Sequence, residues 1–390
     1  MTINQSLGDE YKGKIKPHGG KLIDLFIPPQ EKEKLLKKVD FSHECSDRNA
    51  CDAELLSIGG FSPLTGFMNQ DDYISVVENY KLISGYFFGL PIVLDTNDEN
   101  IKYGNNILLK YKGQNLGILN VSEKWEPNKV LEAKHCYETT STEHPAVRMI
   151  FSERKKYYLG GKYYAFELPK RDFPCKTPKE VRIDLPENHD VIAFQCRNPI
   201  HRAHYELFSN SLTSKNVKKE AVVLVHPTCG PTQQDDIPGR VRFLTYKKLE
   251  EELNDPKIRW AYLPYAMHMA GPREALQHMI IRKNYGCTHF IIGRDMAGCK
   301  SSLSGDDFYG PYDAQNFANK ISHELGMQII PSKNLVYTIE KGYVTAEFAK
   351  DNGLNIQKLS GTQFRQMLRS GENIPEWFAF KSVVDVLRNS

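Results

Sequence analysis

The chain has 390 residues, of which 40% are hydrophobic, 25% are charged and 11% are aromatic. This is the balance of a folded globular protein; it excludes a disordered chain, a collagen and a coiled coil, and the length predicts two or three domains. The formal net charge of +3 is too small to make nucleic acid or an anionic membrane an obligatory partner, so any bound anion must be held by a local cluster of residues.

The start of the chain and its cysteines bear on the cellular compartment. The first 14 residues contain no apolar stretch like that of a secretory leader, and no apolar run approaches the roughly 20 residues of a membrane-spanning helix. The eight cysteines lack the spacing of a disulfide framework, and nothing completes a tetrahedral zinc set around His43, Cys45 and Cys51. We therefore predict a cytoplasmic protein with free thiols and without zinc.

The first 170 residues alternate short apolar or aromatic runs with turns rich in Gly and Pro. Such runs occur at 91–94, 107–109, 116–119 and 163–166, and they predict a compact domain that is β-rich or mixed. The Pro- and Lys-containing stretch that follows, up to about residue 180, is typical of a linker. We place the N-terminal domain at residues 1–168.

After this linker the pattern changes to that of an α/β domain. Nearly continuous apolar runs at 191–194, 221–225, 260–263 and 289–292 alternate with segments of helical spacing at 199–213, 238–253 and 271–285. This alternation predicts a parallel sheet covered on both faces, with function at the loops that leave the carboxyl ends of the strands. We place this domain at 169–324 and a small third domain at 325–390.

The first strand of this sheet is followed by the sequence QCRNPIHRAH, which begins at Gln195. Asn198 is a favoured N-cap and Pro199 a favoured first helical residue, so we expect a helix to begin at 199. Its free N–H groups and positive dipole end would face the end of the strand. This arrangement is an anion site.

Basic side chains gather at the same place. His201 and His204 are spaced i and i+3, which puts them on one helix face, and Arg197 directly precedes the helix. Two imidazoles, a guanidinium and a helix N-terminus suit a polyphosphate better than a metal, which would need a third ligand. The alternative is that both histidines are solvated surface residues.

A second glycine-containing segment, GRDMAGCKSS from Gly293, follows the fourth strand. It fails the P-loop pattern because Cys299 separates Gly298 from Lys300, and no helix of suitable apolar period follows. What remains is Arg294 among small residues at a strand end, where backbone N–H groups can approach a ligand closely. The alternative is a simple turn.

These two segments resemble the signature motifs of the ATP sulfurylases (sulfate adenylyltransferases). Further segments resemble that family in the same order along nearly the whole chain: IKPHGG at 15–20, GFSPLTGFM at 60–68, HPAV at 144–147, GPREA at 271–275, FYGPYDAQ at 308–315 and LSGT at 359–362. The resemblance implies a PUA-like N-terminal β domain, a central Rossmann-like nucleotidyltransferase domain and a small C-terminal domain. It also implies a homodimer that converts MgATP and sulfate to adenosine 5′-phosphosulfate and pyrophosphate.

The resemblance carries roles over to particular residues. Sulfate would be held by Gln195, Arg197 and the backbone of Ala297, and ATP by Gln195, Cys196, Arg197, Asn198, Gly293, Arg294, Asp295, Met296 and Leu335. The catalytic set would be Cys196, Arg197, Asn198, His201, His204 and Arg294. The chain departs from many members at Cys196, where they have Thr, and at Met296, where they have His. Cys196 still offers its backbone N–H, whereas Met296 cannot donate a side-chain hydrogen bond.

The chemistry of the substrates sets the mechanism that we expect. Sulfate is already a dianion and needs no general base, so catalysis must come from positioning and from preorganised positive charge. No Ser/Cys–His arrangement indicates a covalent intermediate, and we predict direct in-line attack on the α-phosphorus. Magnesium would arrive on the triphosphate, because no carboxylate cluster awaits it.

Two other classes of function remain as alternatives. One is another H-x-x-H nucleotidylyltransferase that adenylylates a phosphorylated organic acceptor, although such enzymes usually have Gly between the histidines, where Arg202 and Ala203 stand here. The other is an RNA-binding module, since PUA-like domains can bind RNA. The small net charge and the lack of a basic, aromatic surface motif argue against it.

Overall fold

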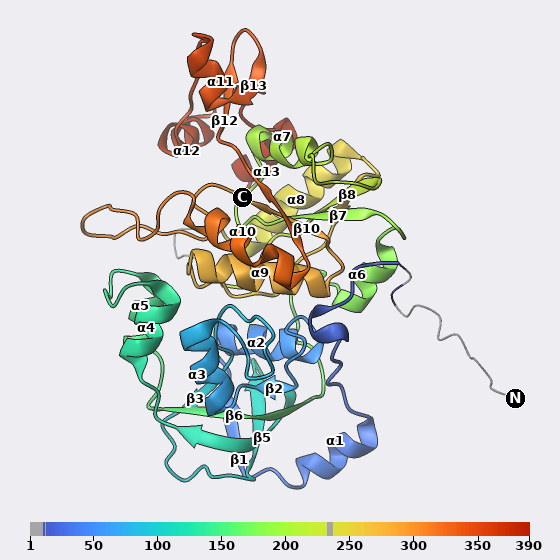
Figure 1. The fold of residues 1–390 in the computed structure, drawn as a ribbon, viewed down its shortest axis with the longest axis vertical. Helices are drawn as coiled ribbons and strands as arrows, with labels where there is room; N and C mark the ends of the chain where they lie inside the picture. Colours follow the sequence, from blue (N-terminus) through green and yellow to red (C-terminus); the bar gives the residue numbers. More distant parts are fainter. Residues whose placement is uncertain (1–10, 12, 232–236) are drawn as a thin grey trace, which may run out of the picture.

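The computed structural model describes residue 11 and residues 13–231 and 237–390. Within them, three sheets follow one another along the chain and along the long axis of the molecule (Figure 1). The predicted absence of a secretory leader concerns residues that lie almost entirely outside this part of the chain. None of the described helices combines the length and the apolar character needed to cross a membrane.

A mixed sheet in the order β1-β4-β5-β6-β2, with β3 paired to β6, forms the N-terminal part of the fold. Its strands are β1 (Phe41–Glu44), β2 (Gly66–Phe67), β3 (Leu94–Thr96), β4 (Asn106–Tyr111), β5 (Gln114–Trp125) and β6 (Tyr157–Ala165). The helices around it are η1 (His18–Gly20), α1 (Pro29–Leu36), α2 (Asp47–Ser57), α3 (Gln70–Asn79), α4 (Lys129–Tyr137) and α5 (Pro145–Ser152). The predicted runs at 107–109 and 116–119 lie within β4 and β5, whereas the buried run at 91–94 enters a strand only at its last residue.

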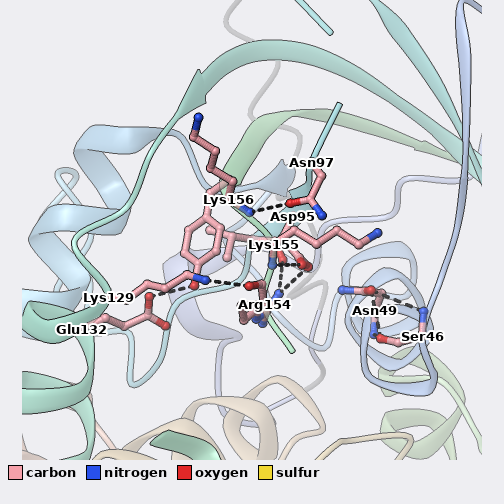
Figure 2. Close-up of polar contacts among 11 residues, drawn as sticks. Ser46, Asn49, Asp95, Asn97, Lys129, Glu132, Arg154, Lys155 and Lys156 are labelled. Atoms are coloured by element: carbon pink, nitrogen blue, oxygen red, sulfur yellow. Dashed lines mark hydrogen bonds and ion pairs between the residues drawn. The ribbon is translucent and has the colours of Figure 1, made fainter. Parts of the chain in front are cut away.

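A buried polar network ties the elements of this N-terminal part together (Figure 2). Arg154 Nη1 lies 3.0 Å from the carboxylate of Asp95, which also accepts the backbone N–H of Lys155 at 2.8 Å. Lys129 Nζ donates to the carbonyl of Arg154 at 2.6 Å, and Glu132 accepts two tyrosine hydroxyls at 2.8 and 3.0 Å. Because the buried guanidinium has a carboxylate partner, its charge is compensated locally.

The central sheet is entirely parallel, in the order β11-β10-β7-β8-β9. Its strands are β7 (Asp190–Phe194), β8 (Ala221–Val225), β9 (Ile258–Trp260), β10 (His289–Ile292) and β11 (Gln328–Pro331). Its helices are α6 (Pro178–Asp184), α7 (Arg202–Ser211), α8 (Gly239–Leu253), α9 (Pro272–Asn284) and α10 (Asp313–Leu325). The first strand in sequence is therefore central, with the second on one side and the fourth on the other, which is the Rossmann-like order.

Helices cover both faces of this sheet, as predicted. Val191 and Ala193 of β7 belong to a core that continues through α9 into the N-terminal part, whereas Ile192 and Phe194 pack with α7 and α8 on the opposite face. Every residue of α9 except Lys283 is buried, because this helix lies between the parallel sheet and the N-terminal part (Figure 1).

The C-terminal part consists of a three-stranded antiparallel sheet and three helices. Its elements are β12 (Leu335–Thr338), β13 (Gly342–Thr345), α11 (Ala346–Asp351), β14 (Ile356–Gln357), α12 (Gly361–Ser370) and α13 (Lys381–Arg388). The helix predicted from Phe364, Met367 and Leu368 is α12. The chain then returns to the parallel sheet, since Phe380 and Val383 join the core beneath α7 and α8.

One expected element begins later than the sequence indicates. The sequence predicts a helix from residue 199 with Asn198 as its N-cap, but α7 begins at Arg202 with His201 as the N-cap. Tertiary contacts outweigh the local signals here: the side chain of Ile200 is fully buried, the Asn198 carbonyl accepts the Tyr246 hydroxyl at 3.0 Å, and the Arg202 N–H donates to the C-terminal part.

Candidate active site

A pocket of about 390 Å³ lies at the carboxyl ends of β7 and β10. These strands are neighbours in the sheet, but the chain leaves β7 toward β8 and leaves β10 toward β11. Such a switch point opens a crevice in which α/β proteins bind ligands. The pocket is lined by residues 194–198, the first turns of α7, the segment around 267–269, residues 293–298 and residues 332–335.

The predicted site residues come from three separate stretches of the chain and meet in this pocket. All of them except His201 line it: Gln195, Cys196, Arg197, Asn198, His204, Gly293, Arg294, Asp295, Met296, Ala297 and Leu335. The pocket therefore joins the two strand ends on which the sequence analysis concentrated. Leu335 reaches it as the first residue of β12.

His201 lies behind His204 rather than at the pocket surface. The two rings are nearly parallel, with centroids 5.5 Å apart, and the far side of His201 packs on Phe364 and Phe378. The backbone N–H of His201 donates to Nδ1 of His204 at 3.3 Å. Burial lowers the pKa of both imidazoles to about 4, so without ligand both are neutral at neutral pH and act as hydrogen-bonding groups rather than fixed cations.

Gln195 is held by both ends of its side-chain amide. Nε2 donates to Thr228 Oγ1 at 2.6 Å, and Oε1 accepts a hydrogen bond from the guanidinium of Arg282. Next to it, burial raises the pKa of the Cys196 thiol to about 12. Cys196 is therefore a thiol rather than a thiolate at neutral pH.

Side chains of α8 fix the backbone of Arg197 and Asn198. Arg242 Nη1 donates to the Arg197 carbonyl at 2.7 Å and to the Thr228 carbonyl at 3.1 Å. With the Tyr246 hydroxyl on the Asn198 carbonyl, α8 thus fixes the turn that presents Arg197 and Asn198 to the pocket.

The segment after β10 is a tight turn. Asp295 and Ala297 both adopt left-handed backbone angles, with φ of 57° and 51°, and the Gly298 N–H donates to the Asp295 carbonyl at 3.0 Å. Arg294 is half exposed, and its Nε lies 3.3 Å from the Asp295 carboxylate. Left-handed angles at two non-glycine residues cost free energy, which is typical of backbone held for a ligand.

The N-terminal part reaches the pocket through a segment outside the predicted site residues. Met267 and Met269 line the pocket, and the Met267 carbonyl accepts a hydrogen bond from Arg48 at 2.7 Å. Nε2 of His144 lies 3.0 Å from the Met269 carbonyl. Because Nδ1 of His144 accepts the Ala146 N–H, Nε2 carries the proton and donates. The family-like motifs that contain His144 and follow Met269 were the only signal of this contact.

The charge around the pocket suits an anionic ligand. Arg197, Arg294 and Lys333 line it, and Asp295 is the one carboxylate among its described lining residues. Within the described residues, no three His, Cys, Asp or Glu side chains are grouped so as to hold a metal ion. The arrangement can bind and orient polyanions, and it offers hydrogen-bond donors rather than a nucleophile.

Comparisons with known proteins agree with this picture. A family model described as ATP-sulfurylase matches residues 174–390, and one described as a PUA-like domain matches residues 15–168.

Curated relatives that carry the name sulfate adenylyltransferase match most of the chain. The Neurospora crassa protein is 41% identical over 96% of this chain and 67% of its own length. The Schizosaccharomyces pombe protein is 42% identical over 88% and 72%, and that of Saccharomyces cerevisiae is 39% identical over 96% and 75%. A solved structure described as a hexameric APS kinase from Thiobacillus denitrificans superposes with a TM-score of 0.74 at 25% identity, over 96% of this chain and 68% of that one.

Proposed function

The chain belongs to the ATP-sulfurylase family, and we propose that the pocket at the ends of β7 and β10 is where it transfers the adenylyl group of ATP to sulfate. The activity is that of a sulfate adenylyltransferase, which forms adenosine 5′-phosphosulfate and pyrophosphate. The observation that carries the assignment of the site is the meeting of residues 195–198, His204 and residues 293–297 in one pocket. The alternative with a phosphorylated organic acceptor has no observation in its favour.

Sulfate is placed against Gln195, Arg197 and the backbone at Ala297. These groups come from the two strand ends that face each other across the switch point, so together they can hold a tetrahedral anion from two sides. Sulfate attacks the α-phosphorus directly and in line, because as a dianion it needs no deprotonation. Arg197 reduces the repulsion between the two anions.

ATP is placed along residues 293–296 and Leu335, with its phosphates toward α7. A Cβ added at Gly293 would meet no atom within 4 Å, which leaves room there for a nucleotide. His204, as a neutral imidazole, donates to the pyrophosphate as it leaves, and Arg294 stabilises the same charge. His201 acts from behind His204, on whose ring it stacks.

Magnesium enters as part of the MgATP substrate and neutralises charge on the triphosphate. The family resemblance suggests a homodimer, and the pattern of free cysteines suggests the cytoplasm. The chain divides near residue 168 in this proposal, as the sequence predicts. Because β11 belongs to the parallel sheet, we extend the central domain through Pro331, beyond the boundary at 324.

The test is release of pyrophosphate from MgATP by the purified protein, with no oxyanion, with sulfate and with molybdate. Molybdate is a tetrahedral dianion whose adenylyl adduct should hydrolyse at once, which makes release continuous. We expect release to require the oxyanion and to fall by about 10² or more in Arg197→Ala. Arg369→Ala, an exposed arginine on α12, is the matched control and should keep full activity.

Two outcomes would overturn the proposal. Release that is independent of the oxyanion, from a protein that still binds ATP, would point to an organic acceptor instead. Near-normal turnover of Arg197→Ala at saturating sulfate would remove Arg197 from the site.

A further inference from the structure

Arg282 lies directly behind the proposed sulfate site and is buried without an acidic partner among the residues that the structure describes. It belongs to α9, and its side chain is fully buried. Its guanidinium donates to Gln195 Oε1 and to the His226 carbonyl, the latter at 2.9 Å, and Nη1 lies 2.6 Å from Nδ1 of His278. No described carboxylate forms an ion pair with it.

Four other arginines with little exposed side chain are compensated in ways that Arg282 is not, whereas Arg242 resembles Arg282 in donating to uncharged groups, the carbonyls of Arg197 and Thr228. Arg154 pairs with a carboxylate at 3.0 Å (Figure 2), and Arg171 pairs with one at 2.5 Å. Arg182 and Arg273 donate to carbonyl groups at the carboxyl ends of α9 and α3, where the helix dipole is negative. The partners of Arg282 are an amide, a loop carbonyl and an imidazole, none of which carries a negative charge.

The surroundings leave the guanidinium charged. Burial lowers its pKa to about 10, so the positive charge remains at neutral pH. The imidazoles of His226 and His278 have pKa values well below the ordinary range, mainly because of burial and also because of the charge on Arg282. Both rings are therefore neutral, and neither adds to nor cancels the charge.

A buried charge is costly unless something compensates it. The amide of Gln195 links this charge to the pocket, because Gln195 lines the pocket while its Oε1 accepts a hydrogen bond from Arg282. In the low-dielectric interior the field of the guanidinium reaches a bound anion with little screening.

We propose that Arg282 is a positioning residue that fixes the Gln195 amide at the sulfate site and makes the site prefer a tetrahedral dianion to a monoanion of the same shape. The bound dianion supplies the negative charge that the protein does not provide around Arg282. This inference rests on the proposed assignment of Gln195 to the sulfate site.

A charge effect and a purely geometric effect differ in what they predict for two anions of one shape. Coulomb energy is proportional to the charge of the ligand. Removing a cation therefore lowers the binding free energy of a dianion by twice as much as that of a monoanion. If Arg282 contributes about threefold to the binding of a monoanion, it contributes roughly tenfold to that of a dianion. Misplacement of Gln195 alone would weaken the binding of both anions by the same factor.

The experiment uses monofluorophosphate and fluorosulfate, which are isoelectronic tetrahedral anions with charges of −2 and −1. Their inhibition constants against sulfate are measured at saturating MgATP for the wild-type protein, for Arg282→Met and for Arg282→Gln. We expect both variants to raise the constant for the dianion about tenfold and that for the monoanion about threefold. Arg282→Lys should keep the ratio of the two constants close to that of the wild type.

Controls separate the possible failures. Arg182→Met removes another buried guanidinium that donates to backbone carbonyls, and it should lower the melting temperature without changing either inhibition constant. Gln195→Ala tests the assignment of the site: if it leaves the KM for sulfate unchanged, that assignment is wrong. If Gln195→Ala raises this KM but the neutral Arg282 variants weaken both anions equally, the site stands and the role of the Arg282 charge is overturned.

Discussion

The backbone of Gly293 faces open space at the end of β10. Its φ does not lie in the left-handed region, and an added Cβ would meet no atom within 4 Å. The fold therefore does not require glycine at this position, although the same backbone lines the pocket. In the proposed ATP site, the absence of a side chain at Gly293 leaves room for the nucleotide.

Replacing this glycine should harm binding and spare the fold. We expect Gly293→Val to lower kcat/KM for ATP by about tenfold or more, because its methyl groups enter the space of the nucleotide. The free energy of unfolding should change by less than about 0.5 kcal/mol. Steady-state kinetics and urea denaturation check both points, with Gly361→Val at the start of α12 as the control. An unfolded variant, or one with normal kinetics, would contradict this reading.

The stacked imidazoles make a second prediction at the scale of residues. Because the His201 ring stacks on that of His204 and the His201 backbone N–H donates to Nδ1 of His204, the two residues should act as a unit. We expect His201→Ala and His204→Ala each to reduce turnover by about 10², and the double variant to lose far less than the product of the two. Turnover at saturating substrates measures this. Losses that multiply would mean that the two rings act independently.

At the scale of elements, α9 and the segment that precedes it connect the N-terminal part to the pocket. The polar residues of α9 face in different directions: Arg273 and Gln277 bond to the backbone at 89–90 in the N-terminal part, whereas Arg282 bonds to Gln195. The segment at 267–269 is held by Arg48 and His144 from the same side. The N-terminal part therefore forms the support of one pocket wall.

We expect His144→Phe to affect catalysis as well as stability. It removes the hydrogen bond to the Met269 carbonyl, so the wall that carries Met269 moves, and kcat/KM for both substrates should fall by about tenfold. Asn284→Ala is the matched control, because it breaks hydrogen bonds to the carbonyls of Gly60 and Ser62 away from the pocket. Both variants should lower the melting temperature, but only His144→Phe should change kcat/KM. Equal kinetics in the two variants would count against a support role.

What the sequence predicts well, and what it does not, follows from the range of the forces involved. Strands such as β7, β8 and β10 could be predicted because burial on both faces leaves a continuous apolar run. The start of α7 could not, because distant contacts at Ile200 and Asn198 override a local N-cap signal. Arg282 gave no signal either, since a helix buried all round shows no polar face, and only the tertiary structure reveals which buried polar residue touches the site.

At the scale of the whole molecule, burial governs the ionisation of most histidines. Nine of the twelve have a pKa below the ordinary value, chiefly because burial disfavours the charged ring: His18, His43, His144, His201, His204, His226, His268, His278 and His289. They occur on both sides of α9 and in both large parts of the fold. Acid should therefore change the stability of both large parts of the fold.

The free energy of unfolding changes with pH because the folded and unfolded chains bind different numbers of protons. Between about pH 6.5 and pH 4, the histidines whose pKa in the folded state is about 4 are protonated in the unfolded chain but not in the folded one: His18, His144, His201 and His204. Their contribution to stability therefore falls as the pH falls. Six carboxylates with a raised pKa act in the opposite direction, because the folded state takes up protons first: Asp52, Glu54, Glu132, Glu138, Glu250 and Glu274. The histidines with a lowered pKa are the larger group, so we expect the net effect of acid to be destabilising.

We expect urea denaturation to give a lower free energy of unfolding at pH 5 than at pH 7. Each histidine that is not offset contributes about 1.4 kcal/mol per pH unit within the window. His18→Gln tests one contribution: burial holds the pKa of His18 at about 4, and its Nε2 lies 2.7 Å from the Phe87 carbonyl. Gln can still donate to that carbonyl but binds no proton. The free energy of unfolding of the variant should therefore depend less steeply on pH than that of the wild type, by a slope that corresponds to about one proton. A free energy of unfolding that stays constant or rises toward pH 5 would show that the raised carboxylates, and not the histidines, dominate the acid response.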